Sequence, residues 1–306
     1  MRGDPLATRA RHWARWRRRQ ARDVWRHRAH LDLLADDARA AWVCSWQRSG
    51  STWLAETLAS GEGTRLIYEP ANVPGRLFTG ESAQLVPLPT APGPELRAVE
   101  RALRGRIHGA WVDQLSTGHL VRRRVVKDVR AVGLLGAVAA RHPATPIVLL
   151  VRHPLSIARS AARLGWTGTD GDADARLVDE VRRWATLHAA ALRSPAASRA
   201  LLVAYEHLVL SPDETLSRVL AHLAARHPTW RGLDVDRTRL ASPSATTFRE
   251  PAARTPQQWV GSFDGVPRGV LDDVVDVLSA AGLGRLYGGS PEPLVAPDAV
   301  GSLLTA

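Results

Sequence analysis

Short apolar runs alternate with longer amphipathic segments along most of the chain. The runs are rich in Val, Ile, Leu and Ala and have the length of strands, whereas the segments between them have helical spacing. The pattern predicts strands at 41–46, 66–68, 124–127, 147–151 and 201–205. It predicts helices up to about residue 60, over 95–117, around 131–141, after 154, near 173–193 and 212–226, and over about 267–282. Such alternation is typical of a parallel sheet with helices on both faces.

This pattern predicts an α/β fold of the P-loop type, with three layers in which helices flank a central parallel sheet. Residues 39–288 are expected to form this domain. Residues 1–38 differ, because they interleave many arginines with three tryptophans and read as a basic helical segment. Residues 289–306 are expected to be a loosely ordered C-terminal tail. Residues 71–96 read as a long irregular loop and are expected to form a wall of the substrate pocket.

A short polar loop joins the first predicted strand to its helix. It contains Arg48, Ser49, Gly50, Ser51, Thr52 and Trp53. Backbone N–H groups of such a loop and of the first helical turn converge on one point, where the helix dipole adds positive potential. The hydroxyl groups can donate hydrogen bonds to phosphate oxygens and the arginine can neutralise charge. The loop therefore indicates a phosphate-containing ligand, with a helix-capping turn as the alternative interpretation.

A second strand-to-helix junction carries a matching pattern. The apolar strand 146–151 ends at Arg152, and Pro154 stands where a helix begins. Ser160 lies eight residues after Arg152, so both side chains can reach one anion above the end of the strand. A surface arginine and a buried serine would be the structural alternative. Two such junctions about a hundred residues apart make coincidence improbable.

These two motifs resemble the donor-binding motifs of sulfotransferases that use 3′-phosphoadenosine 5′-phosphosulfate (PAPS). The resemblance extends from about residue 40 to 287. Residues 67–70, 125–128 and 203–212 are similar to the Glu-Pro, Lys-Asp and Tyr-Glu-x-Leu segments of carbohydrate and protein-tyrosine sulfotransferases. The His base and the Lys-bearing loop that are usual in members acting on small phenols have no clear counterpart.

The resemblance implies transfer of a sulfuryl group from PAPS to a hydroxyl group, less readily to an amine, of a sugar, a tyrosine or a natural product. Glu69 would be the general base, with a structural ion pair to Arg65 or Arg76 as its alternative role. Lys127, the chain's only lysine, and Arg48 would stabilise the departing oxygen. Arg152 and Ser160 would hold the 3′-phosphate. A later basic loop would close over it, and its candidates are Arg249 and Arg254.

Composition narrows the choice of partners only a little. Forty-one Lys and Arg against thirty Asp and Glu give a formal net charge of +11, which favours anionic ligands in general. The N-terminal segment can contact an anionic membrane surface weakly, but we favour packing on the domain, and we expect no specific nucleic-acid partner. The acceptor is expected to be a small molecule, a glycan or a peptide. The sequence predicts no oligomeric state.

The remaining residue counts set the expected chemistry and compartment. The single cysteine, Cys44, lies in the first predicted strand and reads as a small buried hydrophobe. Cysteines and histidines lack zinc spacing, so we expect no metal, and with no signal or transmembrane stretch we expect a cytoplasmic protein. Two other classes remain as alternatives: a small-molecule kinase, for which the Walker lysine is missing, and a basic nucleic-acid-binding protein.

Overall fold

The computed structural model describes residues 32, 35–72, 93–109, 111–116, 120–166, 172–241 and 256–300. Their five parallel strands form one sheet in the order β2-β3-β1-β4-β5. The strands are β1 (Ala40–Ser45), β2 (Thr64–Tyr68), β3 (Arg123–Asp128), β4 (Ile147–Val151) and β5 (Ala200–Ala204). The helices are α2 (Ser51–Ala59), α3 (Pro94–Leu103), α4 (Leu135–Arg141), α5 (Pro154–Arg163), α6 (Ala173–Leu192), α7 (Tyr205–Leu210), α8 (Pro212–Arg226), α9 (Pro256–Val260) and α10 (Arg268–Ala280).

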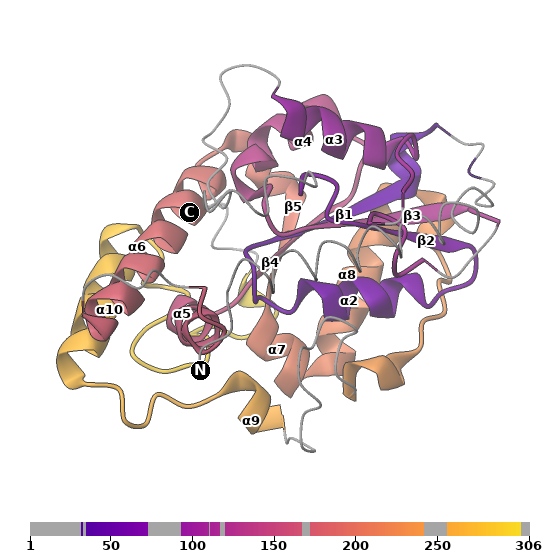
Figure 1. The fold of residues 1–306 in the computed structure, drawn as a ribbon. Helices are drawn as coiled ribbons and strands as arrows, with labels where there is room; N and C mark the ends of the chain where they lie inside the picture. The colour runs from indigo at the N-terminus through magenta and orange to yellow at the C-terminus, as the bar shows by residue number, and fades with distance from the viewer. Residues whose placement is uncertain are drawn as a thin grey trace, which may run out of the picture.

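Helices cover both faces of the sheet, so the predicted α/β class is confirmed (Figure 1). Successive strand residues point to opposite faces, and in β1 Trp42 and Cys44 contribute to one core while Ala41 and Val43 contribute to the other. The first core is completed by α3, α4, α5, α6 and α10. The second is completed by α2, α7 and α8. Burial on two sides explains why the strands read as continuous apolar runs.

The strand order creates a crevice at the carboxyl ends of β1 and β4. These two strands are neighbours, with Trp42 paired to Ile147 and Ser45 to Leu150. After β1 the chain enters α2 on one face of the sheet, and after β4 it enters α5 on the other. Neighbouring strands whose connections leave in opposite directions form a topological switch point, where open α/β sheets bind ligands. Both predicted anion-binding motifs therefore lie at the switch point, where folds of this kind bind ligands.

The structure corrects two of the predicted elements. The helix predicted over 95–117 is wrong beyond Leu103, because Gly105 adopts a positive φ of 68° and donates its N–H to the carbonyl of Ala102. A left-handed glycine just after the last helical residues is a common helix stop. Tyr205 was predicted to end the last strand, but it begins α7.

The chain ends fall partly outside the described residues. Of the basic segment 1–38, the structure describes only residue 32 and residues 35–38, so its predicted helical character stays a prediction. Of the segment 289–306, residues 289–300 are described. Val300 is fully buried in the first core, and the guanidinium of Arg218 donates a hydrogen bond to the carbonyl of Pro297. Most of the loop predicted over 71–96 also lies outside the described residues.

Candidate active site

The loop between β1 and α2 has the geometry of an anion cradle. Arg48 and Gly50 have positive φ angles of 64° and 82°, and α2 begins immediately afterwards at Ser51. Left-handed residues before a helix turn consecutive backbone N–H groups toward one point, to which the helix N-terminus adds positive potential. Ser49 is fully buried, and its hydroxyl has no hydrogen-bond partner among the described residues. Ser51 and Thr52 are buried beside it.

Gly50 is required by close packing as well as by its backbone conformation. A Cβ atom at this position would lie 2.4 Å from Cδ2 of Tyr205, closer than carbon atoms approach without a shift. Tyr205 in turn lies under Arg152, whose guanidinium carbon is 4.4 Å from the centroid of the ring. The cradle loop, the first residue of α7 and the end of β4 therefore pack as one unit.

A Gly50→Ala substitution is expected to weaken binding of a phosphorylated nucleotide about tenfold, because the ring that supports Arg152 must move. Gly282→Ala is a matched control, since Gly282 also has a positive φ, of 76°, but open space around its Cα. Each variant should lose about 1 kcal/mol of stability to the backbone conformation alone. Calorimetric titration with 3′-phosphoadenosine 5′-phosphate (PAP) tests the difference; equal affinity in both variants would contradict this account of Gly50.

The fold brings together three of the predicted donor-binding residues from two junctions. Nε of Arg48 donates to the Ser160 hydroxyl at 3.2 Å, and Nη1 of Arg152 donates to the carbonyl of Arg48 at 3.1 Å. Burial and the neighbouring charge of Arg152 lower the pKa of Arg48. Arg48 pairs with no carboxylate within the described ranges. Because the charge of Arg152 acts on Arg48, an anion bound near both would stabilise the two guanidinium groups.

The other predicted donor contacts have different outcomes. Trp53 extends from α2 toward the 3-10 turn Arg237–Ala241, where its indole N–H donates to the carbonyl of Arg239 at 2.5 Å. Its ring also lies against Tyr205, with centroids 6.1 Å apart. Trp53 therefore lies beside the cradle but is held partly by a structural contact. Arg249 and Arg254 lie outside the described residues, and their assignment stays a prediction.

Glu69 and Lys127 form a buried ion pair next to the cradle. Nζ of Lys127 lies 2.5 Å from Oε1 of Glu69, and both side chains are almost fully buried. The pair forms because β2 and β3 are neighbours, with Tyr68 in register with Lys127 at the carboxyl ends of the strands. Arg65, one predicted structural partner of Glu69, instead pairs with Asp32 and Asp113. Arg76, the other, lies outside the described residues.

Several groups keep the Glu69 carboxyl ionised. Burial alone would raise its pKa, but the charge and hydrogen bond of Lys127, with hydrogen bonds from Asn72 and Tyr68, outweigh burial and lower it. Nδ2 of Asn72 donates to Oε2 at 2.9 Å. Burial raises the pKa of Tyr68, and the carboxylate of Glu69 raises it further. Glu69 is therefore a carboxylate at neutral pH.

Tyr68 joins the ion pair to the cradle. Its hydroxyl interacts with both the Glu69 carboxylate and the Thr52 hydroxyl. The ammonium of Lys127 lies 4.4 Å from the centroid of its ring. One side chain thus contacts the predicted base, the predicted cation and the predicted phosphate-binding loop. This role could not be predicted from the sequence, because it depends on which strands are neighbours in the sheet.

Asp128 shapes the turn that carries Glu69. Its two carboxyl oxygens accept hydrogen bonds of 2.8 Å from the backbone N–H groups of Ala71 and Arg130. Burial raises its pKa to about 6, although the two hydrogen bonds oppose the rise. The carboxyl group thus binds backbone N–H groups on both sides and holds residues 69–72 close to the end of β3. These contacts suit a role in orienting the neighbouring residues.

A buried polar network surrounds His153, the residue after Arg152. This network was not predicted. Glu206 accepts hydrogen bonds from the backbone N–H of His153 at 2.9 Å and from the Tyr287 hydroxyl at 2.8 Å. Burial lowers the pKa of His153 to about 4. Its Nδ1 accepts from the N–H of Leu155 and its Nε2 lies 3.0 Å from the carbonyl of Gly288, so the neutral ring donates there. These residues fix the start of α5, and hence the direction of Arg152.

The described residues contain neither a metal-binding cluster nor a membrane-spanning helix. Within those ranges, no three or more His, Cys, Asp or Glu side chains gather where they could hold a metal ion. No helix of the described chain has both the length and the apolar character needed to cross a membrane. Cys44 is a free, fully buried thiol whose pKa is raised by burial and by Asp128.

Comparison with known proteins identifies the family. Solved structures that the chain is similar to include the sulfotransferase domain of a Synechococcus olefin synthase, with 18% identity, coverage of 79% of this chain and 93% of that one, and a TM-score of 0.41. A mouse sulfotransferase complexed with PAP has 15% identity, coverages of 83% and 89%, and a TM-score of 0.44. The sulfotransferase domain from the curacin biosynthetic pathway has 16% identity, coverages of 78% and 96%, and a TM-score of 0.43.

These structural likenesses do not decide the family, which rests on the sequence. No curated protein matches the chain significantly. The model of the sulfotransferase family, however, matches residues 41–228, more than half of the chain and the part that contains the cradle, the buried ion pair and Arg152. The match leaves no support for the alternative of a small-molecule kinase. The chain is an enzyme and belongs to the sulfotransferase family.

Proposed function

We propose that the protein transfers the sulfuryl group of PAPS to a hydroxyl group, less readily to an amine, of a sugar, a tyrosine or a natural-product acceptor. The observation that carries this proposal is the buried Lys127–Glu69 pair beside the cradle, in which the carbonyl of Arg48 accepts a hydrogen bond from Arg152. A cation and an ionised carboxylate next to an anion site are the groups that sulfuryl transfer requires. Family membership supports the same conclusion.

The residues of the cradle suit a donor with two anionic groups. The buried Ser49 hydroxyl lacks a partner within the described chain, and the backbone N–H groups at the start of α2 offer donors for the 5′-phosphosulfate. Arg152 and Ser160 would hold the 3′-phosphate, as the motif resemblance implies. Arg48 contacts both of these residues, so it would share the charge of the two groups.

The mechanism assigns each side chain one task. The bound donor supplies the sulfuryl group, which passes in line to the acceptor oxygen as the bond from sulfur to the phosphate oxygen breaks. Glu69 accepts the acceptor's proton, so the products are a sulfate ester, PAP and one proton released later to water. Lys127 and Arg48 stabilise the negative charge that grows on the departing phosphate oxygen. Asn72 and Tyr68 hold the base in place.

Nucleotide binding is the first test of this proposal. PAP at about 100 times its dissociation constant should stabilise the fold by about 2.7 kcal/mol, a rise of several degrees in melting temperature. ATP with magnesium, and AMP, should give smaller shifts. Arg152→Ala should weaken PAP binding about tenfold or more through loss of a charged contact. Arg182→Ala, which removes an exposed arginine of α6 paired with Asp179, is the matched control.

Transfer is then measured directly with sulfur-labelled PAPS. The acceptor panel contains a tyrosine peptide, an amino-sugar oligosaccharide and a hydroxylated aromatic natural product. Label should appear in at least one acceptor. Stabilisation by ATP with magnesium but not by PAP would contradict the proposed donor, whereas PAP binding without transfer to any oxygen or nitrogen acceptor would contradict the proposed reaction.

A further inference from the structure

We propose that Trp111 is a positioning residue, which holds the backbone of Glu69 in the conformation that aims its carboxylate at Lys127. This inference rests on the proposed role of Glu69 as general base. Trp111 lies outside both motifs, in a segment that the sequence predicted to be helical and the structure shows as turns.

Glu69 has a conformation that a glutamate adopts only when its surroundings impose it. Its φ is 43°, and Arg48 is the only other described non-glycine residue with a positive φ. A side chain with a Cβ atom is disfavoured in this left-handed region, so the neighbouring contacts must stabilise it. Strained residues of this kind cluster at functional sites, where the exact direction of a side chain matters.

The contacts that hold Glu69 come from two directions. On one side its N–H donates to the carbonyl of Lys127 at 2.7 Å, which continues the strand pairing of β2 and β3 by one residue. On the other side its carbonyl accepts a hydrogen bond of 3.3 Å from the indole N–H of Trp111. The N–H of Asn72 also donates to this carbonyl, at 3.0 Å. The carbonyl of this strained residue therefore accepts one hydrogen bond from a backbone N–H and one from a side chain, that of Trp111.

Trp111 is itself fixed against β2. Its ring meets the ring of Tyr68 edge to face, with centroids 5.4 Å apart. The carbonyl of the next residue, Val112, accepts a hydrogen bond of 2.7 Å from the N–H of Tyr68. The segment thus follows the free edge of β2 at the point where the strand ends, and it delivers the indole N–H to Glu69.

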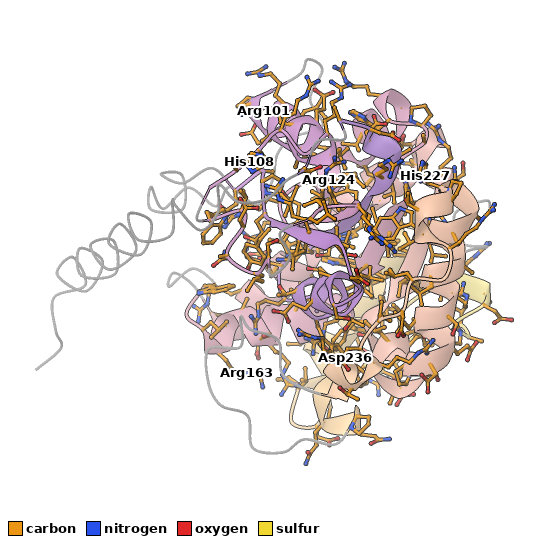
Figure 2. All side chains as sticks on the ribbon, turned by 90° about the vertical axis from the view of Figure 1, so that its right-hand side faces the viewer. Arg101, His108, Arg124, Arg163, His227 and Asp236 are labelled. Carbon is orange, nitrogen blue, oxygen red and sulfur yellow. The ribbon has the colours of Figure 1, made fainter. Side chains whose placement is uncertain are left out.

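A buried ion pair holds this irregular segment in place. Asp113 and Arg65 are both fully buried, and their closest atoms are 2.7 Å apart. Arg65 also donates to the carbonyls of Ile107 and Gly105, while Asp113 accepts from the N–H of Gly109. Arg124, which is labelled in Figure 2 and buried, joins the same cluster through Asp32. A buried pair of this kind fixes a unique geometry, which a segment without helix or strand pairing otherwise lacks.

The test compares Trp111→Phe with Trp230→Phe in the full chain. Phenylalanine at position 111 keeps an aromatic ring against Tyr68 and removes only the indole donor. Trp230 is the matched control because it is buried in the second core and its indole N–H has no partner among the described residues. We expect Trp111→Phe to lower kcat about tenfold through misplacement of the base, and to leave PAP affinity within about twofold of the parent protein.

Two readouts separate positioning from general loss of structure. Hydrogen exchange of the amides of residues 68–72 should become faster in Trp111→Phe. It should not change in Trp230→Phe, because the indole N–H of Trp230 has no hydrogen bond to lose among the described residues. In a double-mutant cycle, Trp111→Phe should lower kcat in the parent protein but have almost no effect in a Glu69→Gln background. Unchanged exchange at residues 68–72, or an equal loss of kcat in both backgrounds, would overturn the inference. Glu69→Gln with the kcat of the parent protein would instead reject the proposed base, so the two failures are distinguishable.

Discussion

Lys127→Met is expected to lower kcat by about 10³-fold, the largest effect of any single substitution in this site. The ammonium is the one compact cation buried next to both Glu69 and the ring of Tyr68. Its charge would meet the phosphate oxygen as the bond to sulfur breaks, in a site from which burial excludes water. The measurement is turnover with labelled PAPS and the fastest acceptor of the panel. A loss of less than tenfold would show that Lys127 does not stabilise the departing oxygen.

The same substitution should also destabilise the fold, and a second variant separates the two effects. Removing Lys127 leaves the buried carboxylate of Glu69 without its cation, at a cost of about 3–5 kcal/mol. The double variant Lys127→Met/Glu69→Gln removes both charges, so its melting temperature should return toward that of the parent protein while turnover stays lost. Lys127→Arg should restore part of the stability but little of the rate, because a planar guanidinium does not fit a site built around a point charge.

The sequence predicted the layers of this fold better than its irregular parts. Strands buried on both faces read as apolar runs, so all five strands are visible without a structure, although β2 begins two residues before its predicted start. The end of α3 was missed although Gly105 is a usual helix stop. The segment after it has no periodic pattern, because its position depends on Arg65 and Asp113 from elsewhere in the chain. Such long-range ion pairs leave no local signal.

In the candidate site, too, residues on local motifs could be predicted and residues brought together by long-range contacts could not. Arg48 lies on one strand-to-helix junction and Arg152 and Ser160 on another, so the sequence alone predicted an anion site at each, whereas the hydrogen bonds that join the two junctions depend on the fold. Glu69 and Lys127 could each be placed only at a strand end. Their contact requires β2 to lie next to β3. In the sheet β3 lies between β2 and β1, although β1 and β2 follow one another in the chain. The supporting roles of Tyr68 and Trp111 follow from that strand order and could not be predicted.

Glu69→Gln is expected to lower kcat by about 10²-fold or more, with PAP affinity nearly unchanged. Glutamine keeps the size of the side chain and an oxygen that accepts from Lys127, but it cannot take a proton from the acceptor. Glu180→Gln is the matched control, because Glu180 is a buried carboxylate of α6 paired with Arg183 outside the crevice. Loss of activity in both variants would point to instability, and loss in neither would reject Glu69 as the base.

The pH dependence gives an independent signature of the same carboxylate. In the donor-free protein the pKa of Glu69 lies below its ordinary value of 4.5. Protonation of Glu69 should therefore not lower kcat/KM at any pH above about 4.5. When Lys127 directs its ammonium to the donor, Glu69 loses the charge that lowers its pKa. The acidic limb of kcat should therefore lie at a higher pH than that of kcat/KM. Coincident limbs would show that Lys127 stays paired with Glu69 throughout turnover.

Stability should follow pH with a sign fixed by the same shift. A carboxyl whose folded pKa is lowered stabilises the protein at pH values above its unfolded pKa, and this contribution is lost as the pH falls through the folded pKa. Glu69→Gln lacks that contribution. Its melting temperature should therefore be below that of the parent protein at pH 7, and the difference should shrink as the pH falls below about 4.5. A difference that stays constant down to pH 3 would mean that Glu69 is not held ionised by Lys127, and the mechanism would then lose its base and its charge-stabilising group together.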